Sequence, residues 1–132
     1  MTCGLYDSAV QALFEGGIDV TSDTLKVVFC RNTYTHSFAH DFLSSIVGGA
    51  RVSTQTLTGV AVSGTDFSAD DFTITALTGS AIYSFVIYKD TGVEATSQLI
   101  YFSNDVSQFP FTPDGSDFAW TWPSPIFSIE HP

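Results

Sequence analysis

The chain has 132 residues and a mass of 14.2 kDa, which is the length of one ordinary domain. Its 4 basic and 14 acidic residues give a formal net charge of −10, which argues against sequence-independent binding of nucleic acid and against binding to anionic membranes. Hydrophobic residues make up 44% of the sequence, which excludes disorder caused by a lack of apolar side chains.

The first predicted element is a helix over residues 5–15. Its apolar positions follow a spacing of three and four residues, which places one apolar stripe along a helix. The stripe consists of Tyr6, Ala9, Val10 and Leu13. Gly16-Gly17 follows directly and predicts the end of the helix.

The next predicted element is a strand over residues 23–30. Leu25, Val27 and Phe29 alternate with polar or smaller neighbours, and Lys26 falls on the opposite face. This alternation predicts a strand that is buried on one face only. A second short helix is an option over residues 40–47, where Gly48-Gly49 would end it.

The remainder of the chain has the period of two that is typical of strands. We predict strands over residues 51–62, 72–77 and 81–88 from their β-branched and aromatic residues. Residues 89–96 are polar with a central glycine, and an apolar run returns at 98–102. Residues 81–88 and 98–102 should therefore form a β-hairpin.

Residues 112–116, Thr-Pro-Asp-Gly-Ser, have the composition of a turn, and a final strand should follow. Phe118, Trp120 and Trp122 alternate with small or polar residues, so their rings should share one face. Prolines at 123 and 125 predict an edge or an extended arm beyond this strand.

The predicted fold class is therefore mainly β (α+β): an antiparallel β-sandwich or barrel with one N-terminal helix and the optional second short helix. A single β-rich domain should span residues 1–132, with extended arms at 1–5 and 123–132. We expect no signal peptide and no membrane anchor, because the N-terminal residues include no basic stretch and no run of about 18 apolar residues occurs. Cys3 and Cys30 are expected to be free thiols.

Three clusters could carry chemistry, and each has a plainer interpretation. Cys30, His36 and His40 have a spacing that could suit zinc, but two histidines in a loop more often make ordinary hydrogen bonds. Asp66, Asp70 and Asp71 could bind a hard cation, but the EF-hand pattern is missing, and a solvated turn is the favoured interpretation.

The third cluster, Asp90-Thr91-Gly92, matches the short signature of aspartic proteases. It falls in a predicted hairpin tip, where a carboxylate pair could not be held at a fixed distance. The sequence has neither the G-x-S-x-G motif of many hydrolases nor a phosphate-binding glycine loop. We therefore predict a non-enzymatic protein with no cofactor, no metal site and no catalytic residue.

Several segments resemble, in order and over nearly the whole chain, small proteins encoded by many tailed bacteriophages. They include Phe-Glu-Gly-Gly-Ile-Asp at 14–19, Leu-Thr-Gly at 57–59, Val-Ile-Tyr-Lys-Asp-Thr-Gly at 86–92 and Thr-Pro-Asp-Gly at 112–115. The resemblance implies a structural protein of the virion, most simply a capsid decoration or cement protein that stabilises the head shell. Implied partners are the major capsid protein and copies of the chain itself, with no nucleic acid and no membrane. Implied localisation is the capsid surface, after synthesis in the host cytoplasm.

Such a protein needs apolar or arm-like contacts, and the two ends of the chain are the candidates. The predicted interface residues are Cys3, Leu5, Tyr6, Trp120, Trp122, Ile126 and Phe127. The alternative is that both ends fold back onto the core. Two other functions stay open: a neck or tail component, and a carbohydrate-binding module in which Trp120 and Trp122 would stack on sugar rings.

Overall fold

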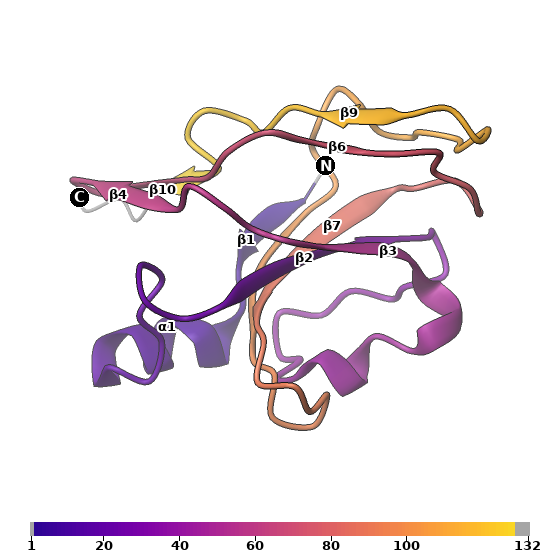
Figure 1. Ribbon diagram of the computed structural model, residues 1–132. Helices are drawn as coiled ribbons and strands as arrows, with labels where there is room; N and C mark the ends of the chain where they lie inside the picture. The colour runs from indigo at the N-terminus through magenta and orange to yellow at the C-terminus, as the bar shows by residue number, and fades with distance from the viewer. Residues whose placement is uncertain (1, 129–132) are drawn as a thin grey trace.

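The computed structural model describes residues 2–128, and it has the mainly β, α+β fold that the sequence predicts (Figure 1). Over these residues it contains ten strands in antiparallel sheets and a single N-terminal α-helix. One sheet has five strands, and two smaller sheets have three and two. In Figure 1 the smaller sheets lie along the top, and the helix and short 3₁₀ turns lie along the bottom. The main sheet therefore has chain on both of its faces.

The main sheet has the strand order β1-β8-β7-β2-β3, and every neighbouring pair is antiparallel. Its strands are β1 (Cys3–Leu5), β8 (Leu99–Ser103), β7 (Ser84–Lys89), β2 (Leu25–Cys30) and β3 (Arg51–Thr56). The three-stranded sheet has the order β10-β5-β4, with β10 (Phe127–Ser128), β5 (Asp66–Ser68) and β4 (Ala61–Ser63). The two-stranded sheet pairs β6 (Phe72–Ile74) with β9 (Phe118–Trp120).

The predicted hairpin is confirmed by the pairing of β7 with β8. Phe85 lies opposite Ser103 and Ile87 opposite Tyr101, and the register shifts between Ile87 and Tyr88. All five residues of β8 are buried, which accounts for its continuous apolar sequence.

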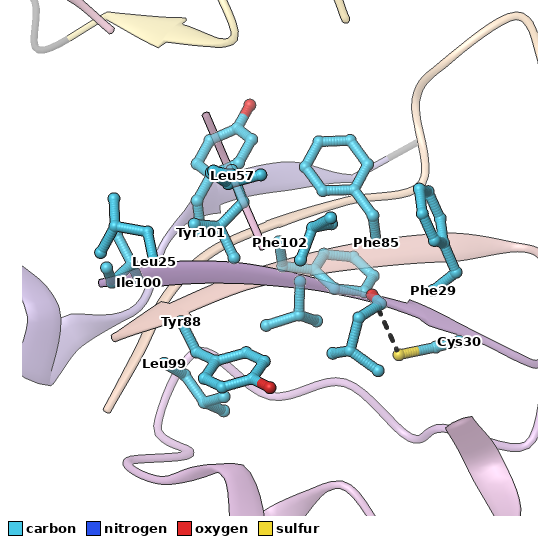
Figure 2. Close-up of a cluster of buried hydrophobic side chains, with 14 of the residues drawn as sticks. Leu25, Phe29, Cys30, Leu57, Phe85, Tyr88, Leu99, Ile100, Tyr101 and Phe102 are labelled. Carbon is cyan, nitrogen blue, oxygen red and sulfur yellow. Dashed lines mark hydrogen bonds between the residues drawn. The ribbon is translucent and has the colours of Figure 1, made fainter. Parts of the chain in front are cut away.

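The prediction that the strand over residues 23–30 is buried on one face only is wrong for β2. It lies between β7 and β3, and Val28 and Cys30 are buried as fully as Leu25, Val27 and Phe29. The close-up in Figure 2 shows Phe85 and Tyr101 on one side of the central strands, with Tyr88 and Cys30 on the other. The apolar–polar alternation is weak here because both faces of this central strand pack against other segments of the same chain.

Aromatic rings fill the space between the main sheet and the two-stranded sheet. The Phe29 ring centroid lies 5.0 Å from that of Trp120 and 5.7 Å from that of Phe118. Phe85 packs edge-on against Trp120 at 5.7 Å and against Trp122 at 5.2 Å. Edge-to-face contacts of this kind add to the stabilisation that burial of the rings supplies. Residues 118–122 alternate between buried and exposed, as predicted.

Helix α1 (Asp7–Glu15) begins two residues later than predicted and ends where predicted. Gly16 adopts the left-handed conformation at φ 79°, and its N–H donates to the Ala12 carbonyl. Tyr6 and Ala9 are fully buried, whereas Leu13 is only partly buried. Three of the four predicted stripe residues, Tyr6, Ala9 and Leu13, therefore contact the core, and Tyr6 does so from the position just before the helix.

The optional second helix over 40–47 is not formed. This segment contains the 3₁₀ turn η1 (Leu43–Ser45), and a second turn, η2 (Gly48–Ala50), follows it. Ile46 and Val47 are extended between the two turns, as suits β-branched residues. The Leu43 N–H donates to the Ser97 carbonyl at 2.8 Å, so its backbone bond goes to another segment instead of to a helix.

The predicted strand over 51–62 is divided into β3 and β4. Gly59 separates them with a positive φ of 61°, and the Asp70 N–H donates to the Thr58 carbonyl just before it. Strand β5 was not predicted, and the predicted strand over 72–77 ends at Ile74. Ala76 has a positive φ of 51°, which a continuing strand could not accommodate.

Candidate functional site

The predicted interface side chains are mostly in the core of this single chain. Tyr6 is fully buried, Trp120 is 1% exposed, Trp122 is 6% exposed, and Ile126 and Phe127 are also buried. The interface prediction therefore needs correction for these five side chains, because in this conformation they already pack within the chain. The alternative, in which the ends fold back, describes them better.

The N-terminal segment is a strand in place of the predicted arm. Strand β1 pairs with β8 from Cys3 opposite Ser103 to Leu5 opposite Tyr101. It lies at an edge of the main sheet, with Cys3 exposed and Leu5 partly buried. Cys3 and Leu5 are thus the two predicted interface residues that keep accessible surface on β1. Cys3 and Cys30 are free thiols.

The C-terminal segment returns to the core in the same way. Phe127 of β10 pairs with Phe67 of β5, and their rings stack with centroids 4.7 Å apart. Phe127 also stacks on Tyr101 of the main sheet at 4.8 Å. The described part of the predicted 123–132 arm therefore folds back, and residues 129–132 lie outside the described residues.

The aspartates of the 66–71 segment bind the C-terminal part of the chain. Asp71 accepts a hydrogen bond from the Trp122 backbone N–H at 2.8 Å, and the Asp70 carbonyl accepts one from Trp122 Nε1 at 3.0 Å. Asp66 pairs with Ser128 across β5 and β10. Sequence reasoning favoured a solvated turn here, and no local pattern could have indicated these long-range partners.

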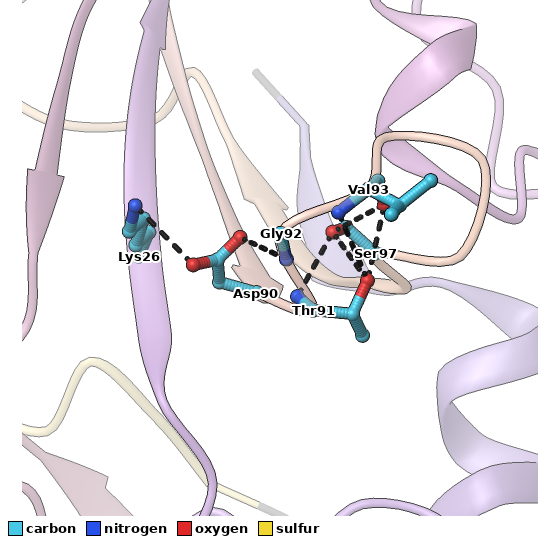
Figure 3. A network of polar contacts seen from close by, with 6 residues as sticks. All are labelled: Lys26, Asp90, Thr91, Gly92, Val93 and Ser97. Atoms are coloured by element: carbon cyan, nitrogen blue, oxygen red, sulfur yellow. Dashed lines mark hydrogen bonds and ion pairs between the residues drawn. The ribbon is translucent and has the colours of Figure 1, made fainter.

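The Asp-Thr-Gly segment forms a hydrogen-bonded turn at the end of β7 (Figure 3). Asp90 forms an ion pair with Lys26 at 3.3 Å and accepts a hydrogen bond from the Gly92 N–H at 3.1 Å. The hydrogen bond from the Gly92 N–H is the main cause of the lowered pKa of Asp90, and the ion pair with Lys26 lowers this pKa further. Thr91 and Ser97 close the turn, because both hydroxyls lie within hydrogen-bond distance of the Val93 carbonyl.

Residues 41–50 and 90–98 are bonded together into one surface, which we call the loop end. The Leu99 N–H donates to the Asp41 carbonyl, the Leu43 N–H to Ser97 and the Ser44 N–H to Glu94. Six large apolar side chains of the described residues are exposed, and three of them belong to the loop end: Phe42 at 36%, Val47 at 65% and Val93 at 57%. The loop end therefore presents apolar side chains on a hydrogen-bonded backbone.

Arg51 links the two segments of the loop end, residues 41–50 and 90–98. Its guanidinium donates to the Ile46 carbonyl at 2.9 and 2.6 Å and to the Leu43 carbonyl at 3.0 Å. It also forms an ion pair with Glu94. One side chain thus adds hydrogen bonds to two carbonyls of this segment, of which the Leu43 carbonyl also accepts the Ile46 N–H within the 3₁₀ turn.

The Cys30, His36 and His40 cluster is not assembled as a metal site. Cys30 lies in β2, and its thiol donates to the Val28 carbonyl. Burial raises the pKa of this thiol to about 12, which keeps it protonated. Among residues 2–128, no group of three or more His, Cys, Asp or Glu side chains could hold a metal ion.

The two histidines instead belong to a chain of hydrogen bonds that starts at Tyr6. The Tyr6 hydroxyl lies 2.8 Å from the Tyr34 hydroxyl and 3.3 Å from His36 Nδ1, and Tyr34 lies 3.0 Å from His40 Nδ1. The His36 ring stacks on Phe102 at 3.7 Å. Burial, with a smaller contribution from His40, lowers the pKa of His36 to about 4, so the ring is neutral near pH 7.

A pocket of about 410 Å³ lies beside this chain of hydrogen bonds. Its walls come from the segment after β2, the start of β7 and the end of β8 with the residues that follow. The lining residues are Arg31, Asn32, Tyr34, His36, Tyr83, Ser84, Phe102, Asn104, Phe109 and Pro110. Sequence reasoning missed this pocket, because its walls come from segments that are far apart in the chain.

Comparison with protein-family models, with curated proteins and with solved structures found no match to this chain. No helix of residues 2–128 has the length and apolar character needed to cross a membrane.

Proposed function

We propose that the chain is a non-enzymatic structural protein of a tailed-phage particle, a decoration or cement protein that stabilises the capsid shell. Its partners would be the major capsid protein and further copies of the chain, on the outer surface of the head. The family resemblance of the sequence motifs suggests the particle. The loop end is the observation that carries the proposed mode of attachment.

The loop end suits attachment to another protein for two reasons. Phe42, Val47 and Val93 expose apolar surface, and removing such surface from water is the main favourable contribution to most protein association. Arg51 and the backbone bonds between residues 41–50 and 90–98 already fix this surface, so little ordering entropy is lost on binding.

The low content of charged side chains favours the same role. They make up 14% of the chain, whereas roughly 25% is typical, and the 16 serines and 16 threonines provide uncharged polar groups. Hydroxyl groups cost less to remove from water than ionised groups do, so such a surface can be covered by a neighbour.

The first experiment is a measurement of copy number in purified particles of the virus that encodes the chain. A decoration protein should be present in hundreds of copies, comparable in number with the major capsid protein, and its removal should leave the tail attached. A few copies per particle would instead favour a neck or tail component. Complete absence from the particles would overturn the structural role.

The loop end is tested by Val47→Asp and Val93→Asp, each of which places a charge in the proposed contact. Each should lower occupancy on the capsid roughly tenfold, which corresponds to about 1.4 kcal/mol of binding free energy. The matched control is Val62→Asp, because Val62 is 48% exposed on β4 and lies outside the loop end. Equal occupancy for all three variants would reject the loop end as the attachment surface.

The burial of Trp120 and Trp122 argues against the carbohydrate-binding alternative, which required both rings to be exposed. Trp120 and Trp122 are buried among Phe29, Phe85 and Phe72 and have almost no exposed ring surface. A sugar ring could not stack on them in this conformation.

A further inference from the structure

The pocket beside Tyr34 differs in charge from the rest of this acidic chain. The chain has 14 acidic residues, yet none of the ten residues that line this described pocket is acidic. Two other hollows among the described residues are each lined by an aspartate, Asp66 in one and Asp105 in the other. The pocket beside Tyr34 is therefore the hollow best suited to an anionic group.

Arg31 supplies the positive charge of this pocket. Lys26, Arg51 and Lys89 form ion pairs, whereas Arg31 has no acidic partner among residues 2–128. Its Nη1 donates to the Gly49 carbonyl at 2.8 Å, which steadies the guanidinium. A guanidinium has five N–H donors in a planar fork, so others remain for a carboxylate.

Two amide side chains add neutral hydrogen-bonding groups to the walls. Asn104 accepts a bond from the Thr2 N–H at 2.7 Å through Oδ1, and this contact orients its amide with the NH₂ group turned away from Thr2. Asn32 also lines the pocket. It is exposed and lies in the segment that follows β2. Amide groups both donate and accept, which suits a ligand with several hydroxyl groups.

Aromatic rings supply the apolar part of the same pocket. Tyr83 is 40% exposed, and Tyr34 and Phe109 are partly buried. Tyr34 is steadied by its hydroxyl bonds to Tyr6 and His40, and Phe109 by stacking on Trp120 at 5.4 Å. Rings that are already fixed lose little freedom when a ligand packs on them.

We propose that this pocket binds a carboxylate-bearing pyranose, that is, a uronic acid, either free or as part of a polysaccharide. The sugar carboxylate would pair with Arg31, its hydroxyl groups would bond to Asn32 and Asn104, and its C–H face would pack on Tyr83. A volume of about 410 Å³ is within the range of about 300–1,000 Å³ for small-molecule sites. The inference does not depend on a capsid role.

Other ligand classes fit the pocket less well. A quaternary ammonium group would gain from the aromatic rings but would be repelled by Arg31. A nucleic acid would bring many phosphates to a chain of net charge −10. A single carboxylate avoids most of this repulsion, because charges more than about 8 Å away are largely screened at physiological ionic strength.

The test compares two probes on the unmodified full chain by amide chemical-shift perturbation. Methyl β-D-glucuronide carries the carboxylate, and methyl β-D-glucoside is its neutral counterpart with the same ring. The glucuronide should bind about tenfold more tightly or better, with shifts centred on residues 31–36, 83–84 and 102–110. Shifts that are absent, centred elsewhere or equal in strength for the two probes would overturn the proposal.

Two variants separate the charge from the aromatic contact. Arg31→Gln should remove the preference for the glucuronide, so that the two probes bind with equal affinity. Tyr83→Ala should weaken both probes about equally, by roughly tenfold. Phe14→Ala is the matched control, since Phe14 is 86% exposed on α1 and does not line the pocket. An unaltered preference in Arg31→Gln would reject Arg31 as the carboxylate partner.

A hyaluronan tetrasaccharide, in which glucuronate alternates with a neutral sugar, distinguishes a site for a free uronic acid from a site for a polysaccharide. Binding tighter than that of the monosaccharide would identify a polysaccharide site. Equal binding would identify a site for a single sugar acid. In both cases the binding should depend on Arg31.

Discussion

The two faces of the main sheet are covered in different ways. On one face, Phe29 and Phe85 pack against the aromatic rings of Phe118 and Trp120, and the contacts are almost entirely apolar. On the other face, residues 31–50 cross the sheet with little regular structure and are held by hydrogen bonds from Tyr6, Tyr34 and Arg51. We call these the aromatic layer and the hydrogen-bonded layer.

Stability and surface function are divided between these two layers. Apolar contact is insensitive to direction, so the aromatic layer can stabilise the fold with few polar groups. Hydrogen bonds fix direction, so the other layer can hold an irregular segment and shape both the loop end and the pocket beside Tyr34. The two layers should therefore respond differently to mutation and to pH.

The largest effect should come from Trp120→Ala in the aromatic layer. Trp120 is 1% exposed and contacts Phe29, Phe85 and Phe109, so truncation leaves a large cavity. We expect a loss of about 3–5 kcal/mol in the free energy of unfolding, measured by urea denaturation. Ala119→Ser, at the exposed neighbouring position, should change it by less than about 0.5 kcal/mol. Similar midpoints for the two variants would contradict this account of the aromatic layer.

A smaller effect, of about 2 kcal/mol, is expected for Arg51→Gln in the hydrogen-bonded layer. The variant removes charge-assisted bonds to the Leu43 and Ile46 carbonyls together with the Glu94 ion pair. Hydrogen exchange should increase first in residues 43–50. Glu94→Gln is the control, because it removes only the ion pair and should cost less than about 1 kcal/mol. Equal losses in both variants would assign the effect to the ion pair.

Tyr6→Phe should cost about 1–2 kcal/mol, because Tyr34 and His36 both lose a partly buried hydrogen-bonding partner. Tyr83→Phe removes a hydroxyl from a side chain that is 40% exposed, and it should leave the thermal unfolding temperature nearly unchanged. If Tyr83→Phe were the more destabilising of the two, the chain of hydrogen bonds from Tyr6 would not be a stabilising feature.

A separate effect, on the pH dependence of stability, should arise from His36. Its pKa is about 4 in the folded chain and about 6.5 when unfolded, so the unfolded chain binds more protons between these values. Its contribution to stability is complete above about pH 6.5 and is lost as the pH falls toward about 4. His36→Phe, which keeps a ring against Phe102, should flatten the stability curve in this window. An unchanged curve would show that His36 does not titrate there.

Local sequence rules predicted the parts of the fold that depend on near neighbours. The alternation of residues 118–122, the hairpin of β7 and β8, and the end of α1 at Gly16 each follow from patterns within a few residues. The same patterns predicted strands at β2, β7 and β8, but they did not predict β1 or β5. Their positions follow from local patterns, but a nine-residue helix and a single hairpin still need tertiary packing for stability.

Only the tertiary structure decided which surfaces remain exposed. Whether Trp120 and Trp122 face a partner or the core depends on where β6 and β9 come to lie, and no local pattern encodes that position. The same holds for residues 40–47, which give up a helix because Ser97 and Arg51, both distant in sequence, take their backbone bonds. Hydrophobic burial and hydrogen bonding between distant segments outweigh local propensity, so near-neighbour patterns determined α1, the β7–β8 hairpin and the alternation of residues 118–122, whereas tertiary contacts determined the remaining short strands and the site.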